Sequence, residues 1–428
     1  MREIEASVGQ RLLWLLDHYR GGNGRVNVPV AWRMRGGIDR VALGLAYEAL
    51  LIRHEVLRTT YTTHDRRLFQ VINDMRPREI AFVDLSGEPH APLVALSAMK
   101  AEARSELDPL CWPIQASLWR IAERDHLLLV NIHHLATDFY SNMIISRDLS
   151  WLYDRITGIS TDELPPVTWS YSNWSEWQRH AFAQGRLKKL QSYWKRRLEG
   201  ARSPLLPRPV DFRGPAPNPT VLDAPGRATL DIEPAILACL RRVARDLRTT
   251  MFPVMLAGFY AHLHSTGCQR DLAVASLLAN RTRAEVYETV GFFVNMIVLR
   301  VQIDSDTTLA DLVRRSRQAL IEAMRHGELP LQLLPARTVT AVDDVVFQYI
   351  EDHTSRESAL DFEPLDMPVA AEAGRFALEL VVFNREHCML RYNSEFRDEW
   401  ARQFLADYAK VLARLAEEPE TLVSAVLT

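Results

Sequence analysis

The 428-residue sequence predicts an α/β protein of two domains, and three observations support this prediction. The chain is too long for one ordinary hydrophobic core, so two domains of about 150–250 residues are expected. Hydrophobic residues make up 47% of the chain and charged residues 25%, which is typical of a globular protein. Strand-like and helix-like segments alternate in both halves, and we detect no internal sequence repeat.

The first half is expected to open with a helix and continue into a sheet. Ser7 is placed to cap the helix, with Gln10 at the third helical position. Residues 26–34 alternate between apolar and other side chains, which predicts a half-buried strand. Pro29 has no N–H for a ladder and makes that strand a candidate for a sheet edge. Residues 127–132 are apolar on both faces, which indicates a strand in the interior of a sheet.

A helix is expected at residues 38–53, followed by strands at 57–63 and 68–73. In the second half, five further strands are expected at DLAVASLLA, MIVLRVQI, DVVFQYIE, FALELVVFN and CMLRYN. A closing helix is expected from about Asp398. Glycine, proline and polar residues cluster at Gly158–Trp169, which marks a boundary between domains. We therefore place the division after residue 170, giving domains of residues 1–170 and 171–428.

Several classes of protein are disfavoured by composition. A net charge of −3 does not suggest a nucleic-acid-binding surface. Cys111, Cys239, Cys268 and Cys388 lie far apart without a CxxC pair, which argues against a zinc knuckle or a disulfide framework and fits a reducing cytoplasm. The charged N-terminus does not resemble a signal peptide, and no apolar run approaches the roughly 20 residues of a membrane span. A cytoplasmic protein without membrane or nucleic-acid partners is expected.

The segment NIHHLATDFYS, Asn131–Ser141, holds the most informative polar residues. His133 and His134 follow the predicted interior strand, and Asp138 stands where the N-cap of the next helix belongs. Adjacent residues of a strand point in opposite directions, so only one histidine shares a site with Asp138. The predicted geometry is a strand, a short loop carrying the histidine pair, and a helix that begins at Asp138.

Four interpretations of the histidine pair differ in chemistry. A metal site lacks a third ligand at a convincing spacing, unlike HExxH. Nucleophilic catalysis lacks a GxSxG elbow. A purely structural pair at a strand end and a single general base both fit the residues. The imidazole pKa of about 6.5 suits proton transfer near neutral pH.

Motifs along the chain resemble those of the condensation domains of non-ribosomal peptide synthetases, relatives of chloramphenicol acetyltransferase. HHLATD matches the family's HHxxxD core, and SVGQRLLWLL (Ser7–Leu16) resembles its opening SxAQxRLWxL. The remaining matches follow in the family's order: RHEVLRTTY at Arg53–Tyr61, YSNWSEWQ at Tyr171–Gln178, VGFFVNMIVLR at Val290–Arg300, HGELPLQLL at His326–Leu334, and LRYNSEFRDEW near the C-terminus. The resemblance spans almost the whole chain.

This resemblance implies two acetyltransferase-like lobes, residues 1–170 carrying HHxxxD and residues 171–428, arranged as a V with a tunnel between them. It implies that His134 is the catalytic histidine, that Asp138 is structural, and that His133 supports the loop. Arg281 in LANRTR is the candidate ion-pair partner of Asp138. Asn295 either lines the tunnel or packs in the core.

The implied reaction is amide bond formation between an acyl thioester on an acyl or peptidyl carrier protein and a carrier-bound or soluble amine. The 4′-phosphopantetheine arms come from the partner carriers, and no metal or cofactor is expected on the chain itself. The sequence contains no adenylation motif and no GGxS carrier motif. Together with the initial Met and the full motif set, this favours a free-standing, monomeric enzyme.

The sequence departs from the family pattern at several positions. Phe139 replaces the glycine after the aspartate, Leu12 replaces the arginine of the first motif, and Gly327–Glu328 replaces a Gln–Asp pair. A phenylalanine beside the catalytic histidine is expected to narrow the substrate site, since glycine has no Cβ. Its backbone N–H at a helix start still suits an oxyanion.

Two other functions share the fold. A non-catalytic condensation-like domain would recruit other proteins, and an ester-forming acyltransferase would use an alcohol acceptor. The DFGWG motif of the plant-type acyltransferases is absent from the sequence. The sequence identifies neither the acyl donor nor the acceptor.

Overall fold

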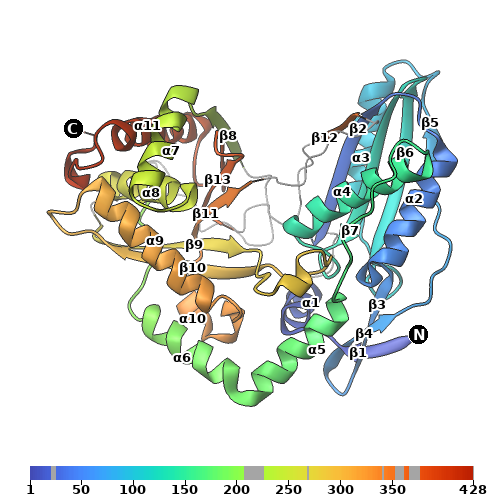
Figure 1. The fold of residues 1–428 in the computed structure, drawn as a ribbon, viewed down its shortest axis with the longest axis horizontal. Helices are drawn as coiled ribbons and strands as arrows, with labels where there is room; N and C mark the ends of the chain where they lie inside the picture. Colours follow the sequence, from blue (N-terminus) through green and yellow to red (C-terminus); the bar gives the residue numbers. More distant parts are fainter. Residues whose placement is uncertain are drawn as a thin grey trace. The chain divides into compact units, whose positions relative to one another are not determined.

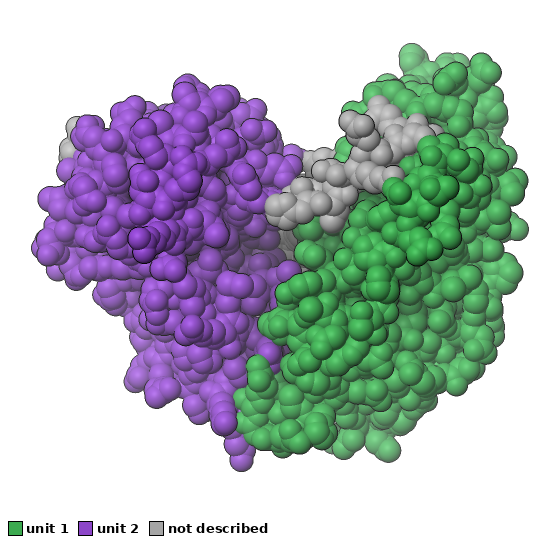
Figure 2. All heavy atoms as spheres, in the orientation of Figure 1, with its two compact units in different colours: residues 1–186, 281–294, 353–371 green, residues 187–280, 295–352, 372–428 purple. Residues whose placement is uncertain are grey.

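The computed structural model describes residues 1–20, 26–206, 226–267, 269–339, 342–351, 361–365 and 376–427. The chain forms two compact units, coloured separately in Figure 2. Unit 1 comprises Met1–Arg186, Arg281–Val294 and His353–Ala371, and unit 2 comprises Leu187–Asn280, Asn295–Asp352 and Glu372–Thr428. Each unit is assembled from separate stretches of chain, whereas the predicted domains, residues 1–170 and 171–428, are continuous.

Unit 1 is built on a five-stranded sheet in the order β12-β2-β7-β6-β5 (Figure 1). All neighbours are antiparallel except β5 and β6. The strands are β2 (Asn27–Arg35), β5 (Ala81–Asp84), β6 (Ile114–Ala122), β7 (Asp125–His133) and β12 (Asp361–Leu365). β7 lies at the centre of this sheet, which confirms the predicted interior strand.

Helices cover both faces of this sheet and explain why β7 is apolar throughout. Leu128, Val130 and Ile132 of β7 pack in one core with α2 (Arg40–Arg53) and α4 (Phe139–Ile156). Leu127 and Leu129 face the opposite core, formed with α3 (Ala91–Ala103). Because successive side chains of a strand point to opposite faces, both sets of β7 residues become buried.

A smaller antiparallel sheet, in the order β1-β4-β3, completes unit 1 together with α1 and α5. Its strands are β1 (Arg2–Glu5), β3 (Thr59–His64) and β4 (Arg67–Ile72), and the helices are α1 (Val8–Arg20) and α5 (Tyr171–Ala181). The predicted cap of α1 is confirmed. The Gln10 N–H donates to Ser7 Oγ at 3.1 Å, and the Ser7 N–H donates to Gln10 Oε1 at 3.1 Å.

The position of β2 differs from the prediction of an edge strand. β12, which comes from the second half of the chain, pairs with β2 from Arg35 to Ala31, so this part of β2 lies between two strands. Pro29 lies beyond the reach of β12 and pairs on its other side with Asn131 of β7. Among the described strands, Pro29 therefore pairs with a strand on one side only. This fits its lack of an N–H group, which could not take part in a second ladder.

Unit 2 contains a six-stranded sheet in the order β10-β9-β11-β13-β14-β8. Its strands are β8 (Gly226–Asp231), β9 (Asp271–Leu278), β10 (Asn295–Gln302), β11 (Val345–Ile350), β13 (Leu378–Phe383) and β14 (His387–Tyr392). Its helices are α6 (Leu187–Arg197), α7 (Pro234–Asp246), α8 (Met251–Gly267), α9 (Leu309–Arg325), α10 (Ala336–Val339) and α11 (Asp398–Glu417). β11 runs parallel to β9 and β13, and the other pairs are antiparallel.

Short helical turns connect these elements: η1 (Glu55–Arg58), η2 (Phe182–Arg186), η3 (Ala284–Val286), η4 (Leu331–Leu333) and η6 (Val423–Ala425). The α/β class and the closing helix at Asp398 are confirmed. Within the described ranges, no helix combines the length and apolar character that crossing a bilayer requires.

The helix α5 explains why unit 1 continues past the predicted boundary at residue 170. Tyr171 and Trp174 of this helix are buried in the same core as Val290 and Phe293, which come from the later segment Arg281–Val294. The glycine- and proline-rich stretch before α5 is therefore a surface connection within one unit.

A buried histidine in unit 2 makes the stability of the fold dependent on pH. His262 of α8 is 1% exposed and contacts the Phe404 ring of α11 at 4.2 Å between centroids. Neither of its ring nitrogens has a hydrogen-bond partner among the described residues. Burial lowers the pKa of His262 to about 4, against a weaker opposing effect of Asp407.

We predict that the free energy of unfolding falls by about 3 kcal/mol between pH 7 and pH 4 through His262 alone. The unfolded chain takes up the proton near pH 6.5 and the folded chain only near pH 4, so stability is complete above pH 6.5 and declines below it. His262→Leu should remove this part of the pH dependence in urea denaturation, whereas the exposed His180→Leu should not. An unchanged pH profile in His262→Leu would contradict the assignment.

Candidate active site

The histidine pair lies where β7 ends. His133 is the last residue of the strand, and its N–H donates to the Pro113 carbonyl at 2.7 Å. The N–H of His134 donates to the Val26 carbonyl at 2.8 Å, so the ladder bonds extend through both residues. The side chain of His133 is buried at 1% exposure, whereas that of His134 is only partly buried.

The two imidazoles have opposite hydrogen-bond polarity. His134 Nδ1 lies 2.7 Å from the Thr137 carbonyl, which only accepts, so Nδ1 carries the proton in the neutral ring. His133 Nδ1 accepts the Leu135 N–H at 3.1 Å, so its proton is on Nε2. His134 therefore has its lone pair on Nε2, as a general base requires. His133 stabilises the loop by accepting the N–H of Leu135.

Buried polar groups hold this loop from behind. The Leu135 carbonyl accepts hydrogen bonds from Gln10 Nε2 at 2.9 Å and from the Tyr61 hydroxyl at 3.0 Å. Burial raises the pKa of Tyr61 well above its ordinary value, so the phenol stays a donor. The capped start of α1 is thereby joined to the loop that carries His134.

Asp138 is the N-cap of α4 and is 1% exposed. Its Oδ1 accepts the Ser141 N–H at 2.8 Å, and its Oδ2 accepts the N–H groups of Phe293 and Val294 at 2.9 and 3.0 Å. The carboxylate thus serves the first turn of α4 and a backbone segment about 155 residues later. It has no oxygen left for a reacting group, which makes its contribution structural.

The predicted ion-pair candidate Arg281 lies beside this carboxylate. Its Nη2 is 3.6 Å from Asp138 Oδ1, and both side chains are almost fully buried. The guanidinium carbon lies 4.4 Å from the centre of the Tyr140 ring and 4.1 Å from that of Phe293. Burial lowers the pKa of Arg281, and the nearby charge of Asp138 opposes this shift. The aromatic faces and the carboxylate together stabilise the buried cation.

Ser141 and Tyr171 fix the same backbone segment, and sequence reasoning did not assign them to the site. Ser141 Oγ donates to the Gly291 carbonyl at 2.8 Å and accepts the Gly291 N–H at 3.0 Å and Arg281 Nη2 at 2.8 Å. The Tyr171 hydroxyl donates to the Phe292 carbonyl at 2.7 Å. A Cβ on Gly291 would lie 1.9 Å from Tyr171 Cδ2, so only glycine fits there.

Phe139 and Asn295 occupy different surroundings. Phe139 is the first residue of α4 and is 49% exposed, and no hydrogen bond of its N–H is formed within the described part of the chain. Asn295 begins β10 in unit 2, is 7% exposed, and donates from Nδ2 to the Gly327 carbonyl at 2.7 Å. Its amide group therefore stabilises the turn at Gly327.

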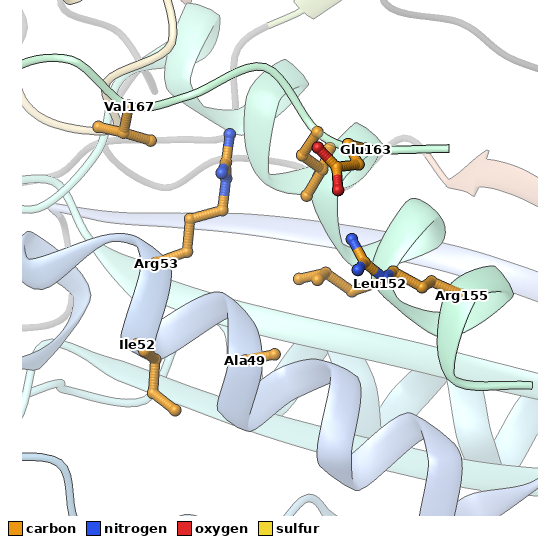
Figure 3. Close-up of a pocket in the computed structure, with 8 residues that line it drawn as sticks. Ala49, Ile52, Arg53, Leu152, Arg155, Glu163 and Val167 are labelled. Atoms are coloured by element: carbon orange, nitrogen blue, oxygen red, sulfur yellow. The ribbon is translucent and has the colours of Figure 1, made fainter. Parts of the chain in front are cut away.

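No cluster of three or more histidine, cysteine, aspartate or glutamate side chains suited to a metal ion occurs in the described ranges. A groove of about 580 Å³ lies elsewhere on unit 1, between α2, the second half of α4 and residues 163–167 (Figure 3). Arg53, one of its lining residues, donates from Nε to the buried Asp148 at 2.8 Å. This arginine belongs to the RHEVLR segment, whose contribution here is to join α2 and α4.

Comparison with known proteins identifies the family. The family profile described as "Condensation domain" matches residues 2–428. The chain belongs to the condensation domain family. This condensation domain is 29% identical over 433 residues to the phosphinothricin tripeptide synthetase PhsC of Streptomyces viridochromogenes, covering 97% of the chain and 39% of that protein. It is 30% identical over 447 residues to the beauvericin nonribosomal cyclodepsipeptide synthetase of Beauveria bassiana, covering 98% of the chain and 14% of that protein. The chain therefore spans well under half the length of these relatives.

Solved structures of condensation domains share the fold of this chain. The condensation domain from the monacolin K polyketide synthase MokA is 20% identical and matches with a TM-score of 0.82, covering 99% of both chains. The X-domain from teicoplanin biosynthesis is 22% identical and matches with a TM-score of 0.81 over 99% of this condensation domain and 97% of that chain. The V-shaped arrangement and the tunnel stay predictions.

We predict that Asp138→Ala lowers the free energy of unfolding by about 3–5 kcal/mol, because it leaves the buried Arg281 cation without its counter-charge and three buried backbone N–H groups without their acceptor. The matched control is Asp39→Ala. Asp39 is the exposed N-cap of α2 and accepts the N–H groups of Val41 and Ala42 without a buried cation.

Loss of such an ordinary cap costs about 1 kcal/mol. Asp138→Asn keeps one acceptor oxygen and should fall between the two alanine variants. Urea denaturation at pH 7 measures all three. Equal losses in Asp138→Ala and Asp39→Ala would show that the carboxylate is only a helix cap.

Proposed function

We propose that this chain is an amide-forming condensation enzyme that joins a carrier-bound acyl thioester to an amine. The observation that carries the proposal is the orientation of His134. Its Nδ1 donates to the Thr137 carbonyl, so the lone pair of the neutral ring is on Nε2, and the ring is only partly buried. The buried bonds of Asp138, Gln10 and Tyr61 hold the loop that carries it.

Aminolysis of a thioester needs little chemical assistance, because the acyl group is already activated. The amine nitrogen forms a bond to the thioester carbonyl carbon, the carbon–sulfur bond breaks, and the leaving thiolate must gain the proton that the amine loses. His134 Nε2 is suited to accept that proton from the amine and to return it to the sulfur. Holding the two reactants together supplies much of the remaining rate enhancement. No acyl-enzyme intermediate is required.

The developing oxyanion needs a hydrogen-bond donor. We propose the N–H of Phe139, which lies at the positive end of the α4 helix dipole. The side chain of Phe139 stands at 49% exposure where the family motif has glycine. In this proposal it limits the size of the acceptor, and Asn295 does not contact substrate because its amide is bonded to Gly327.

The partners in this proposal are acyl or peptidyl carrier proteins, each presenting its substrate on a 4′-phosphopantetheine arm. The sequence has no GGxS motif for such an arm, so the carriers are supplied from outside these 428 residues. We also propose that the chain acts as a free-standing monomer and that the two arms pass between its lobes.

A recruitment domain without catalysis is the competing function, and an ester-forming enzyme is the second. Recruitment requires no defined imidazole tautomer, whereas the bonds around His134 fix one. The 30% identity to a cyclodepsipeptide synthetase keeps ester formation among the outcomes, since depsipeptides contain ester bonds.

We predict that His134→Ala lowers the single-turnover rate of condensation about 10²- to 10⁴-fold, the usual contribution of a general base. The assay supplies an aminoacyl-loaded donor carrier with amine and alcohol acceptors, and detects products by mass spectrometry. The exposed His180→Ala is the control and should keep the wild-type rate. No product with either acceptor from the wild-type chain would favour recruitment, and a near wild-type rate in His134→Ala would remove the base.

A further inference from the structure

The ring of Phe292 contacts the imidazole of His134. The two ring centroids are 4.9 Å apart and the planes are inclined at 83°, which is an edge-to-face contact. Nδ1 is bonded to the Thr137 carbonyl, and the aromatic contact is a further restraint on the imidazole. The aromatic contact opposes a tilt of the ring about the Nδ1 hydrogen bond.

The backbone of Phe292 is held unusually firmly. Its carbonyl accepts the Tyr171 hydroxyl, and the residues on either side are bonded to Ser141 and Asp138. Tyr171 in turn lies 2.8 Å from Ser7 Oγ, and burial raises the pKa of Tyr171, so the phenol stays a donor. The position of the ring is therefore set by the surrounding structure.

The Phe292 ring also lies against the first turn of α1. A Cβ built on Gly9 would lie 3.2 Å from Phe292 Cε1 and 3.3 Å from Cδ1, closer than ordinary contact. The start of α1 cannot easily move away, because Ser7 and Gln10 cap it and Gln10 also holds the Leu135 carbonyl.

We propose that Phe292 is a positioning residue for His134 and that Gly9 provides the space in which its ring lies. The pair sets the tilt of the imidazole and with it the direction of the Nε2 lone pair. A methyl group at residue 9 displaces the Phe292 ring, which is in contact with His134. This inference rests on the proposed function for its kinetic consequence, whereas the geometric part concerns the imidazole alone.

The test compares Gly9→Ala with Gly44→Ala. Both glycines are in helices, and a Cβ on Gly44 of α2 would meet no atom within 4 Å. Gly9→Ala should lower kcat about 3- to 10-fold with KM nearly unchanged, since small displacements of a catalytic group are costly. Gly44→Ala should keep wild-type kinetics. The midpoint temperature of thermal unfolding should not fall in either variant, because alanine has a higher helix propensity than glycine.

A double-mutant cycle separates positioning from a general effect on the helix. In a Phe292→Ala background the methyl group at residue 9 meets no ring, so Gly9→Ala should change kcat less than about twofold there. Phe292→Leu serves as the second background because it leaves a smaller cavity. An effect of Gly9→Ala that persists undiminished in both backgrounds would overturn the proposal.

A second readout does not require turnover. In protein labelled with ¹³C-histidine, the His134 ring resonance is assigned by its loss in His134→Ala. Gly9→Ala and Phe292→Leu should shift this resonance, while Gly44→Ala should not. An unshifted His134 resonance in Gly9→Ala overturns the positioning role. If the His134 resonance shifts in these variants but the wild-type chain forms no product, the positioning role is supported. Only the proposed function is then rejected.

Discussion

The carboxylate of Asp138 joins three parts of the chain that are distant in sequence or differ in structure. It caps α4, it accepts two N–H groups from the segment at residues 293–294, and it lies beside the buried Arg281. Such a carboxylate is stable in the interior only because these donors and the cation replace the water it loses. The loop of His134 ends at this residue, so the bonds of a buried carboxylate fix the end of the loop that carries the imidazole.

The bonds of Asp138 are complemented by a set of neutral hydrogen bonds. Gln10 and Tyr61 hold the loop at Leu135, while Ser141 and Tyr171 hold the backbone at Gly291 and Phe292. Each of these side chains is buried, and each donates a hydrogen bond to a backbone carbonyl. The arrangement leaves His134 as a partly buried titratable group at the centre of a rigid polar network. Rigid support of this kind is what precise proton transfer requires.

Local patterns in the sequence predict the elements that local physics determines. Apolar residues on both faces predict the central position of β7, and the spacing of Ser7 with Gln10 and the place of Asp138 predict two helix caps, all present in the structure. Arg281 was singled out from the family motif and lies next to Asp138.

Contacts between distant segments are not determined by such patterns. The addition of β12 to β2, and of residues 281–294 to unit 1, depends on pairing across more than a hundred residues. The fit of Gly291 against Tyr171, and of Gly9 against Phe292, depends on distances of a few ångströms between elements. For the same reason the sequence suggested a domain boundary before α5, although that helix packs within unit 1.

The imidazole of His134 is held with its proton on Nδ1 and its lone pair on Nε2. Ring ¹⁵N chemical shifts, measured at a pH where the ring is neutral, distinguish the two tautomers directly. The structure predicts a protonated Nδ1 and an unprotonated Nε2 for His134, with the reverse for His133. A proton on Nε2 of the neutral His134 ring would rule out a general base at this residue, because Nε2 would then have no lone pair to accept a proton.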